Sequence, residues 1–275
     1  METIRQALER SRELDVRPIE HKDYIHAPAP LPPFNADAAI ADRATKKDLV
    51  LNLAHLESNR IIAYDEADAR SKSFDMLRTQ VLQAMDQSNW NVLGITSPTP
   101  GCGKSVTAIN LAFSIARRPE RSVLLVDLDL QKPQVAKYLG VDCGSGVISV
   151  LEERASLADA LIQVRAGSSR ITVLPADSAT SASSAKMSSR ELSTLLQEFR
   201  RDRSHTVVLD LPPMLSSDDA LTIMPQLECI LLVAAVGRSK VSEIGECNKH
   251  LGSTEVVRFV LNKVPNLNSK YDYAY

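Results

Sequence analysis

Aromatic residues, net charge and long apolar runs are all scarce in this 275-residue chain. Phe, Trp and Tyr together make up 4% of the residues, and the formal net charge is -2. A chain so close to neutrality has no general affinity for polyanions, so we expect no nucleic-acid partner. The longest apolar run, 229–236, is far shorter than the roughly eighteen residues of a membrane-spanning helix, so we expect no direct membrane span.

Cysteine is also sparse, and its four positions show no metal-ligand spacing. They are Cys102, Cys143, Cys229 and Cys247. Widely spaced free thiols are typical of proteins in a reducing cytoplasm. The first residues contain no apolar stretch like that of a signal peptide, so we expect a cytoplasmic location.

The few tyrosines are unevenly placed. Three of the six fall in the last five residues and alternate, as Tyr271, Tyr273 and Tyr275. They have no apolar partners around them, so a role in a hydrophobic core is not indicated. Phenol groups at a frayed chain end can accept phosphoryl groups. We therefore predict that these tyrosines are phosphoacceptors, which requires a phosphoryl-donor site in the same protein.

Composition divides the chain into three segments. Residues 1–45 combine an amphipathic helical pattern in 1–15 with a proline-rich stretch in 27–33, which predicts an extended linker. The amphipathic pattern fits equally a helix that caps the domain and one that docks a partner. Residues 46–268 form the predicted main domain, with 46–88 predicted to be helical, and residues 269–275 form the tail.

Short apolar runs alternate with amphipathic stretches of helical length from residue 90 onward. The runs are 92–96, 123–126, 171–174, 206–209, 229–236 and 256–261. Continuous apolar runs suit strands that are covered on both faces, and their alternation with helices predicts an α/β fold with a doubly wound, mostly parallel sheet. In such sheets the functional site lies beyond the carboxyl ends of the strands.

A phosphate-binding loop is predicted directly after the first of these strands. Residues 97–105 read SPTPGCGKS, and their last three residues match the end of a Walker A loop, although Pro98 replaces a glycine of the full pattern. Tight glycine turns let successive N–H groups face an anion beside the positive end of the next helix. A glycine turn that merely caps a helix is the weaker alternative. The predicted nucleotide-binding residues here are Gly101, Cys102, Gly103, Lys104, Ser105 and Val106.

Carboxylates stand at the ends of two further predicted strands. Asp127 and Asp129 follow the run 123–126, and Asp210 follows the run 206–209. Each of them alone could cap a helix or form a turn. Two acidic strand ends together with a phosphate loop predict metal–nucleotide chemistry instead.

In order and spacing, these motifs resemble those of the bacterial tyrosine kinases of capsule and exopolysaccharide synthesis, the CpsD/CapB type. The segments that carry the resemblance are 95–105 (Walker A), 124–133 (a second Walker motif special to this family), 208–213 (Walker B), 217–221, 260–264 and the terminal tyrosines. The resemblance implies a P-loop NTPase of the MinD/ParA-like group, which has a deviant Walker A loop.

The resemblance also implies an activity. Members of this family are ATP-dependent, Mg²⁺-using protein-tyrosine autokinases that phosphorylate their tail tyrosines in trans and regulate the polymerisation and export of exopolysaccharide or capsule. The implied roles are catalysis for Lys104, Asp127, Asp129 and Asp210, with Lys104 on the phosphates and Asp127 on the tyrosine hydroxyl; metal binding for Ser105, Asp129 and Asp210; and a place near the adenine base for Asn262.

Partners and location follow from the same resemblance. Members without membrane-spanning helices form the cytoplasmic half of a two-protein system, in which a membrane chain-length determinant is the activator. We therefore expect a homo-oligomer held at the inner face of the membrane through that partner. The family's Glu-x-x-Arg-x-x-Arg oligomer motif aligns with Lys72, Asp75 and Arg78, of which only Arg78 matches and is a predicted oligomer contact.

Two other functions are compatible with the sequence. One is a MinD/ParA-like ATPase, although Thr99 stands where such proteins carry an additional lysine. The other is a nucleotide-binding adaptor that gates a polysaccharide export complex without strong kinase activity. Cys102, which replaces a common glutamate of the loop, and the altered arginine motif both leave the adaptor possible.

Overall fold

The computed structural model describes residues 48–251 and 255–265, all within the second of the two units, 1–33 and 34–275, into which the chain divides. The predicted N-terminal helix and linker and the three tail tyrosines lie outside these residues, and so does the proposed boundary at residue 268. Among the described residues, no helix combines the length and the apolar character needed to cross a membrane.

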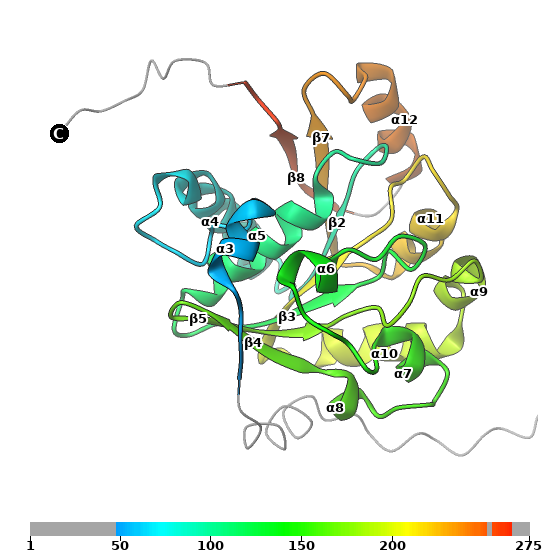
Figure 1. Cartoon of the computed structure of the whole chain (residues 1–275). Coiled ribbons are helices and arrows are strands. Elements are labelled where there is room, and N and C mark those ends of the chain that lie inside the picture. Colours follow the sequence, from blue (N-terminus) through cyan, green and yellow to red (C-terminus); the bar gives the residue numbers. More distant parts are fainter. Residues whose placement is uncertain (1–47, 252–254, 266–275) are drawn as a thin grey trace, which may run out of the picture. The chain divides into compact units, whose positions relative to one another are not determined.

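An eight-stranded sheet forms the centre of the described domain, in the order β1-β4-β5-β3-β6-β2-β7-β8 (Figure 1). The strands are β1 (Leu49–Val50), β2 (Val92–Thr96), β3 (Ser122–Asp127), β4 (Ile162–Ala166), β5 (Ser169–Leu174), β6 (His205–Asp210), β7 (Cys229–Ala235) and β8 (Glu255–Asn262). All neighbouring pairs are parallel except β4 and β5. The predicted α/β class with a mostly parallel sheet is confirmed.

Each of the six apolar runs coincides with a strand, whereas β1 and β4 were not predicted. The central strands β2, β6 and β7 are buried along their whole length, which is why their sequences are continuously apolar. Strand β4 reads IQVRA and is only partly buried. It pairs antiparallel with β5 through a tight turn in which Gly167 has φ +57°. An apolar-run search misses such a half-exposed strand.

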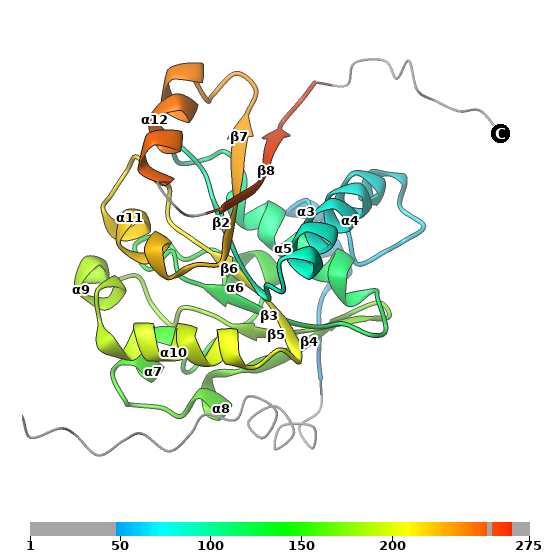
Figure 2. The same ribbon diagram turned by 180° about the vertical axis from the view of Figure 1, so that it is seen from behind.

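Helices cover both faces of the sheet (Figure 1 and Figure 2). One hydrophobic cluster includes α3 (Leu53–Ser58), α4 (Lys72–Gln87), α5 (Lys104–Ala116) and α6 (Val135–Leu139). The other includes α7 (Val147–Leu151), α8 (Leu157–Ala160), α9 (Ser183–Met187), α10 (Arg190–Arg201), α11 (Asp219–Ile223) and α12 (Val241–Leu251), with the short 3₁₀ helix η2 (Met224–Gln226). A second 3₁₀ helix, η1 (Ala69–Ser71), precedes α4.

Helix α10 illustrates how the local sequence fixes this packing. Its buried residues Leu192, Leu195, Leu196 and Phe199 follow the helical spacing of one apolar face, which therefore packs on the sheet. The side chain of Ser189 accepts a hydrogen bond from the Leu192 N–H and caps the helix start. Arg200 and Arg201 lie in the last turn, where positive charge is favourable.

The prediction that 46–88 is helical is wrong for residues 48–52 and 59–68 of that segment. It contains β1, α3, a non-helical stretch from residue 59 to 68, and then η1 and α4. The chain turns at Arg60, whose φ of +62° is left-handed. The side chain of Asn110, buried on α5, replaces helical hydrogen bonds here: its Oδ1 accepts from the Ile62 and Ala63 N–H groups at 2.8 and 2.9 Å.

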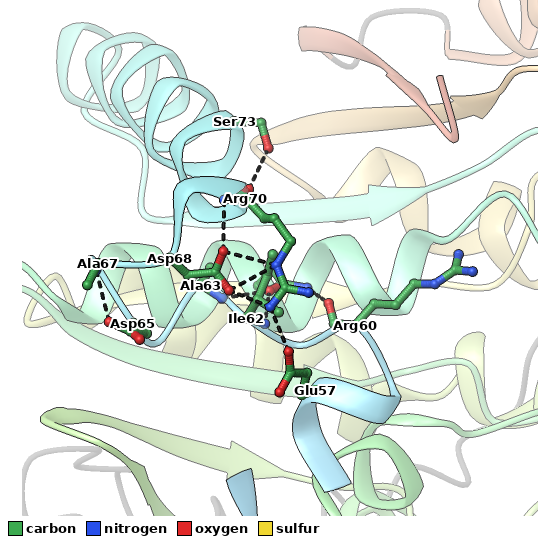
Figure 3. A network of polar contacts seen from close by, with 10 residues as sticks. Glu57, Arg60, Ile62, Ala63, Asp65, Ala67, Asp68, Arg70 and Ser73 are labelled. Carbon is green, nitrogen blue, oxygen red and sulfur yellow. Dashed lines mark hydrogen bonds and ion pairs between the residues drawn. The ribbon is translucent and has the colours of Figure 1, made fainter. Parts of the chain in front are cut away.

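Figure 3 shows the same stretch from close by, with Arg70 between Asp68 and Glu57. Arg70 and Glu57 are largely exposed, so the ion pair between them contributes little to stability. The Asn110 amide nitrogen also donates two hydrogen bonds, one to the Arg60 carbonyl at 2.9 Å and one to the Val106 carbonyl at 2.8 Å. One side chain on the helix after the phosphate loop therefore holds the segment before it.

We predict that Asn110→Ala lowers the free energy of unfolding by roughly 2–5 kcal/mol, because two buried backbone N–H groups lose their acceptor. Urea denaturation measures this loss. Gln83→Ala on the exposed face of α4 is the control and should change stability by less than about 0.5 kcal/mol. Equal midpoints for the two variants would contradict the role of Asn110.

Candidate active site

The phosphate loop connects the buried strand β2 to α5, as the motif predicted. Gly101 and Gly103 have φ of +78° and +95°, a region in which side-chain-bearing residues are strained. A Cβ atom on Gly103 would lie 2.2 Å from the amide nitrogen of Asn262. Glycine is therefore required at position 103 both by the backbone turn and by the close approach of β8.

Lys104 is enclosed by acidic side chains at the carboxyl ends of the strands. Its Nζ lies 2.8 Å from Asp129 Oδ2 and 3.1 Å from Asp210 Oδ1, and it donates to Ser105 Oγ at 3.3 Å. Burial alone would lower the pKa of Lys104, but the charges of Asp210 and Asp129 outweigh burial and raise it. In this conformation the lysine neutralises the carboxylates that are predicted to hold a metal.

Asp210 is completely buried at the end of β6 and lies beside Asp127, since the two residues are register partners on the neighbouring strands β6 and β3. Burial raises the pKa of Asp210, and Lys104 opposes that rise. Its Oδ2 is buried and has no hydrogen-bond partner among the described residues. An unpaired carboxylate oxygen at this place suits a metal-bound water, which donates hydrogen bonds.

Asp127 is also completely buried, and both of its oxygens accept backbone hydrogen bonds. Oδ1 accepts from the Asp129 N–H at 3.1 Å, and Oδ2 accepts from the Gln134 and Val135 N–H groups at 3.0 Å each. Burial and the charge of Asp210 raise the pKa of Asp127 to about 7. Asp127 thus fills the capping role that the sequence left as an alternative, and the start of α6 depends on it.

A pocket of about 810 Å³ lies over the phosphate loop at this edge of the sheet. Gly101, Gly103, Lys104, Ser105, Val106, Asp129 and Asn262 line it, so the structure gathers most of the predicted ATP and metal residues around one space. Asp127 and Asp210 do not line the pocket and lie beneath it. Arg60 and Arg70, which precede α4, and Phe74, which lies in the first turn of α4, also line the pocket.

Of the predicted ATP-binding residues, Cys102 does not line the pocket, and Asn262, which does, contacts the Cys102 backbone. Cys102 is buried and its thiol donates to the Thr99 carbonyl at 3.2 Å. The Asn262 amide donates to the Cys102 carbonyl at 2.9 Å, and its Oδ1 accepts from the Lys263 N–H at 2.8 Å. The placement of Asn262 near the base stays a prediction, but its amide is already committed to the loop.

Two residues of this site were missed in the sequence. Arg238 donates to the Pro100 carbonyl at 2.7 Å, and Lys263 donates to the Gly101 carbonyl at 2.8 Å. Lys263 follows Asn262 and lies in the segment 260–264, which is one of the segments that carry the family resemblance. Arg238, in the turn between β7 and α12, follows no motif that would have identified it.

Arg78, the predicted oligomer contact, is buried within its own chain. It pairs with Asp75 at 3.1 Å and donates to the Ser114 carbonyl at 3.1 Å. Asp75 also accepts from Ser114 Oγ at 2.7 Å and from Arg117. This network joins α4 to α5, and an additional contact of Arg78 with a neighbouring subunit stays a prediction.

Residues 89–246, more than half of the chain, match the ParA family model, whose description is NUBPL iron-transfer P-loop NTPase. The chain belongs to the ParA family of P-loop NTPases. The prediction of a P-loop NTPase from the loop, the acidic strand ends and the parallel sheet is thereby confirmed.

Curated relatives of this ParA-family chain are named as tyrosine kinases. The putative tyrosine-protein kinase EpsB of Ralstonia nicotianae is 31% identical over 212 residues, which are 75% of this chain and 27% of EpsB. The tyrosine-protein kinase YwqD of Bacillus subtilis is 26% identical over 80% of this chain and 92% of YwqD. The chain thus spans about a quarter of the length of the first curated relatives it matches. The resemblance to bacterial tyrosine kinases is confirmed.

Solved structures agree with this placement within the ParA family. The kinase domain of the Escherichia coli tyrosine kinase ETK is 26% identical, with a TM-score of 0.67 over 76% of this chain and 82% of that one. The septum site-determining protein MinD from Pyrococcus horikoshii, complexed with Mg-ADP, has a TM-score of 0.51 over 62% of this chain and 69% of that one. At 24% identity the likeness to MinD shows the fold alone.

We predict that Lys104→Met makes stability steeply dependent on pH. A carboxyl whose folded-state pKa lies above its unfolded value stabilises the fold below the unfolded pKa, and that stability is lost as pH rises through the folded-state pKa. Without the lysine cation the pKa values of Asp127 and Asp210 rise further. The free energy of unfolding of the variant should therefore fall from about pH 4 to pH 8 more than that of the wild type.

Urea titrations at several pH values measure this slope. Lys132→Met is the matched control, because Lys132 is exposed at the same pocket and has the same charge. Parallel pH profiles of Lys104→Met and the wild type would show that the lysine does not stabilise the ionised aspartates.

For Asp75 we predict the opposite dependence of stability on pH. Burial would raise its pKa, but hydrogen bonds from Arg117 and Ser114 outweigh burial and lower it. The stability that ionised Asp75 contributes is therefore complete above its unfolded-state pKa of 3.8, and it is lost as pH falls through the lower folded-state pKa. Asp75→Asn should cost at least about 1 kcal/mol at pH 7 and flatten the acid limb of the stability curve. Asp86→Asn, at an exposed pair with Arg121, should cost less, and an equal loss would contradict the importance of the network.

Proposed function

We propose that this protein is an ATP-dependent protein-tyrosine kinase that phosphorylates its own tail tyrosines, Tyr271, Tyr273 and Tyr275, in a neighbouring copy. The observation that carries the proposal is the buried Lys104 between Asp129 and Asp210, at the end of a phosphate loop and on the wall of a pocket. Kinase chemistry needs a phosphate cradle together with carboxylates. The names of the relatives give the acceptor class.

The residues present fit ATP and Mg²⁺. Lys104 would leave its carboxylate partners to contact the nucleotide phosphates, and the freed Asp129 and Asp210 would support Mg²⁺ together with Ser105. The unpaired Oδ2 of Asp210 supports this assignment, because a buried acceptor without a partner is costly. The ion would neutralise charge that builds up on the transferred phosphoryl group.

In the proposed reaction the phenol oxygen of a tail tyrosine attacks the γ-phosphorus, and the bond to the β–γ bridging oxygen breaks, which releases ADP. The phenol proton passes to Asp127. Its raised pKa suits a proton acceptor near neutral pH. Because Asp127 is completely buried, the turn that leads into α6 must open before the carboxylate reaches a hydroxyl.

The cellular role extends the motif resemblance. We propose that the kinase regulates polymerisation and export of exopolysaccharide or capsule, that it forms a homo-oligomer, and that a membrane chain-length determinant activates it at the inner face of the membrane. A solved chimerical protein, CapA2B2, has a TM-score of 0.67 with this chain, and at 21% identity it supports the fold alone.

A nucleotide-binding adaptor without strong kinase activity is the second candidate. The burial of Asp127 beneath the pocket favours it, since the proposed proton acceptor does not face the pocket in this conformation. A ParA-type ATPase remains a third reading through the family model, but the tail tyrosines have no role in it.

Mass spectrometry of two complementary variants tests the kinase and its direction. One variant carries Lys104→Met and an intact tail; the other carries an intact site and Tyr→Phe at 271, 273 and 275. With ATP and Mg²⁺, neither variant alone should gain phosphotyrosine on the tail. A mixture of the two should phosphorylate the tail of the Lys104→Met copy.

The outcomes separate the candidates. Tail phosphate on the wild type but none in the mixture would overturn transfer between copies. ATP binding without any phosphotyrosine, even with the membrane activator present, would overturn the kinase and leave the adaptor. ATP hydrolysis without phosphotyrosine would point to the ATPase.

A further inference from the structure

Three successive carbonyl groups of the phosphate loop are held by side chains that come from elsewhere in the chain. Arg238 Nε donates to the Pro100 carbonyl at 2.7 Å. Lys263 Nζ donates to the Gly101 carbonyl at 2.8 Å, and Asn262 Nδ2 donates to the Cys102 carbonyl at 2.9 Å. We call Arg238, Asn262 and Lys263 the carbonyl clamp.

The geometry of the peptide bond gives these contacts a consequence. Each peptide unit is planar, with its C=O and N–H pointing in opposite directions. A side chain that fixes the carbonyl of residue 100, 101 or 102 therefore fixes the N–H of the following residue. The clamp sets the directions of the N–H groups of Gly101, Cys102 and Gly103, which are the groups that a phosphate loop turns toward an anion.

The loop needs this outside support because its own sequence is permissive. Gly101 and Gly103 have positive φ and no side chains that could hold them. A Cβ atom on Gly101 would lie 2.7 Å from the Arg238 guanidinium carbon, which shows how closely that side chain lies against the loop. Lys263 itself has φ of +57°, so the chain after β8 turns sharply to bring its amine to the loop.

We propose that the carbonyl clamp positions the phosphate loop. Arg238, Asn262 and Lys263 orient the backbone N–H groups of the loop and thereby raise its affinity for the phosphate chain of a nucleotide. The proposal rests on the nucleotide binding in the proposed function, but not on kinase activity. It assigns Asn262 to the phosphates rather than to the adenine base.

Calorimetric titration of the full chain with Mg-ADP, Mg-GDP and Mg-tripolyphosphate distinguishes these assignments. Asn262→Ala should weaken all three by a similar factor of about ten, which corresponds to the loss of one well-made hydrogen bond and its alignment. If Asn262 contacted the base, Asn262→Ala would instead weaken the binding of ADP, leave the binding of tripolyphosphate unchanged and alter the preference for ADP over GDP.

Lys263 supplies the second variant pair. Lys263→Met should also bind ADP and tripolyphosphate about tenfold more weakly. Lys263→Arg, which keeps a hydrogen-bond donor and the charge, should recover most of that affinity. Lys240→Met is the control, since Lys240 is exposed, lies two residues beyond Arg238 and carries the same charge. It should bind all three ligands as the wild type does.

Thermal unfolding without ligand separates positioning from folding. Lys263 is exposed, so Lys263→Met should leave the melting temperature almost unchanged while affinity falls. Wild-type affinity for tripolyphosphate in both Asn262→Ala and Lys263→Met would overturn the clamp, whatever the kinase assay gives. If the clamp variants bind the ligands more weakly but the wild type phosphorylates nothing, the proposed kinase activity is overturned and the clamp is not. A wild type that binds none of the three ligands would overturn both.

Discussion

The contact of Lys104 with Asp129 and Asp210 is the interaction on which the rest of the site depends. Parallel pairing of β3 and β6 puts Asp127 and Asp210 side by side, and the turn after β3 adds Asp129. Three carboxylates so close together and so deeply buried need a cation nearby. Lys104 supplies that cation, and the proposed binding of a phosphate chain would replace these ion pairs with others.

Distant parts of the chain hold both the phosphate loop and the helix that follows it. The carbonyl clamp holds the loop's carbonyls from β8 and the turn after β7, and Asn110 ties the segment 60–63 to α5. A loop rich in glycine pays a large entropic cost for a fixed conformation. Long-range hydrogen bonds remove that freedom before any ligand arrives, which is the physical meaning of preorganisation.

Asp127 links the fold to the proposed chemistry. The hydrogen bonds that bury its carboxylate also start α6, and the same burial raises its pKa into the range of a useful proton acceptor. The fold and the proposed catalysis therefore depend on the same side chain. Opening of the turn after β3 would expose the carboxylate and, at the same time, return its pKa toward the ordinary value, so access and basicity are coupled.

Continuous apolar runs determined six strands, and the phosphate loop was readable from SPTPGCGKS because its glycines and lysine lie next to one another in the sequence. The sequence also placed Asp127, Asp129 and Asp210 at strand ends. Only the tertiary structure decided that Asp127 and Asp210 lie beneath the pocket, that Arg78 bonds to Ser114 inside the chain, and that Arg238 and Lys263 hold the loop. Those contacts join residues up to 162 positions apart. Local periodicity carries no information on such pairs, because the packing of strands, turns and helices in the fold brings them together.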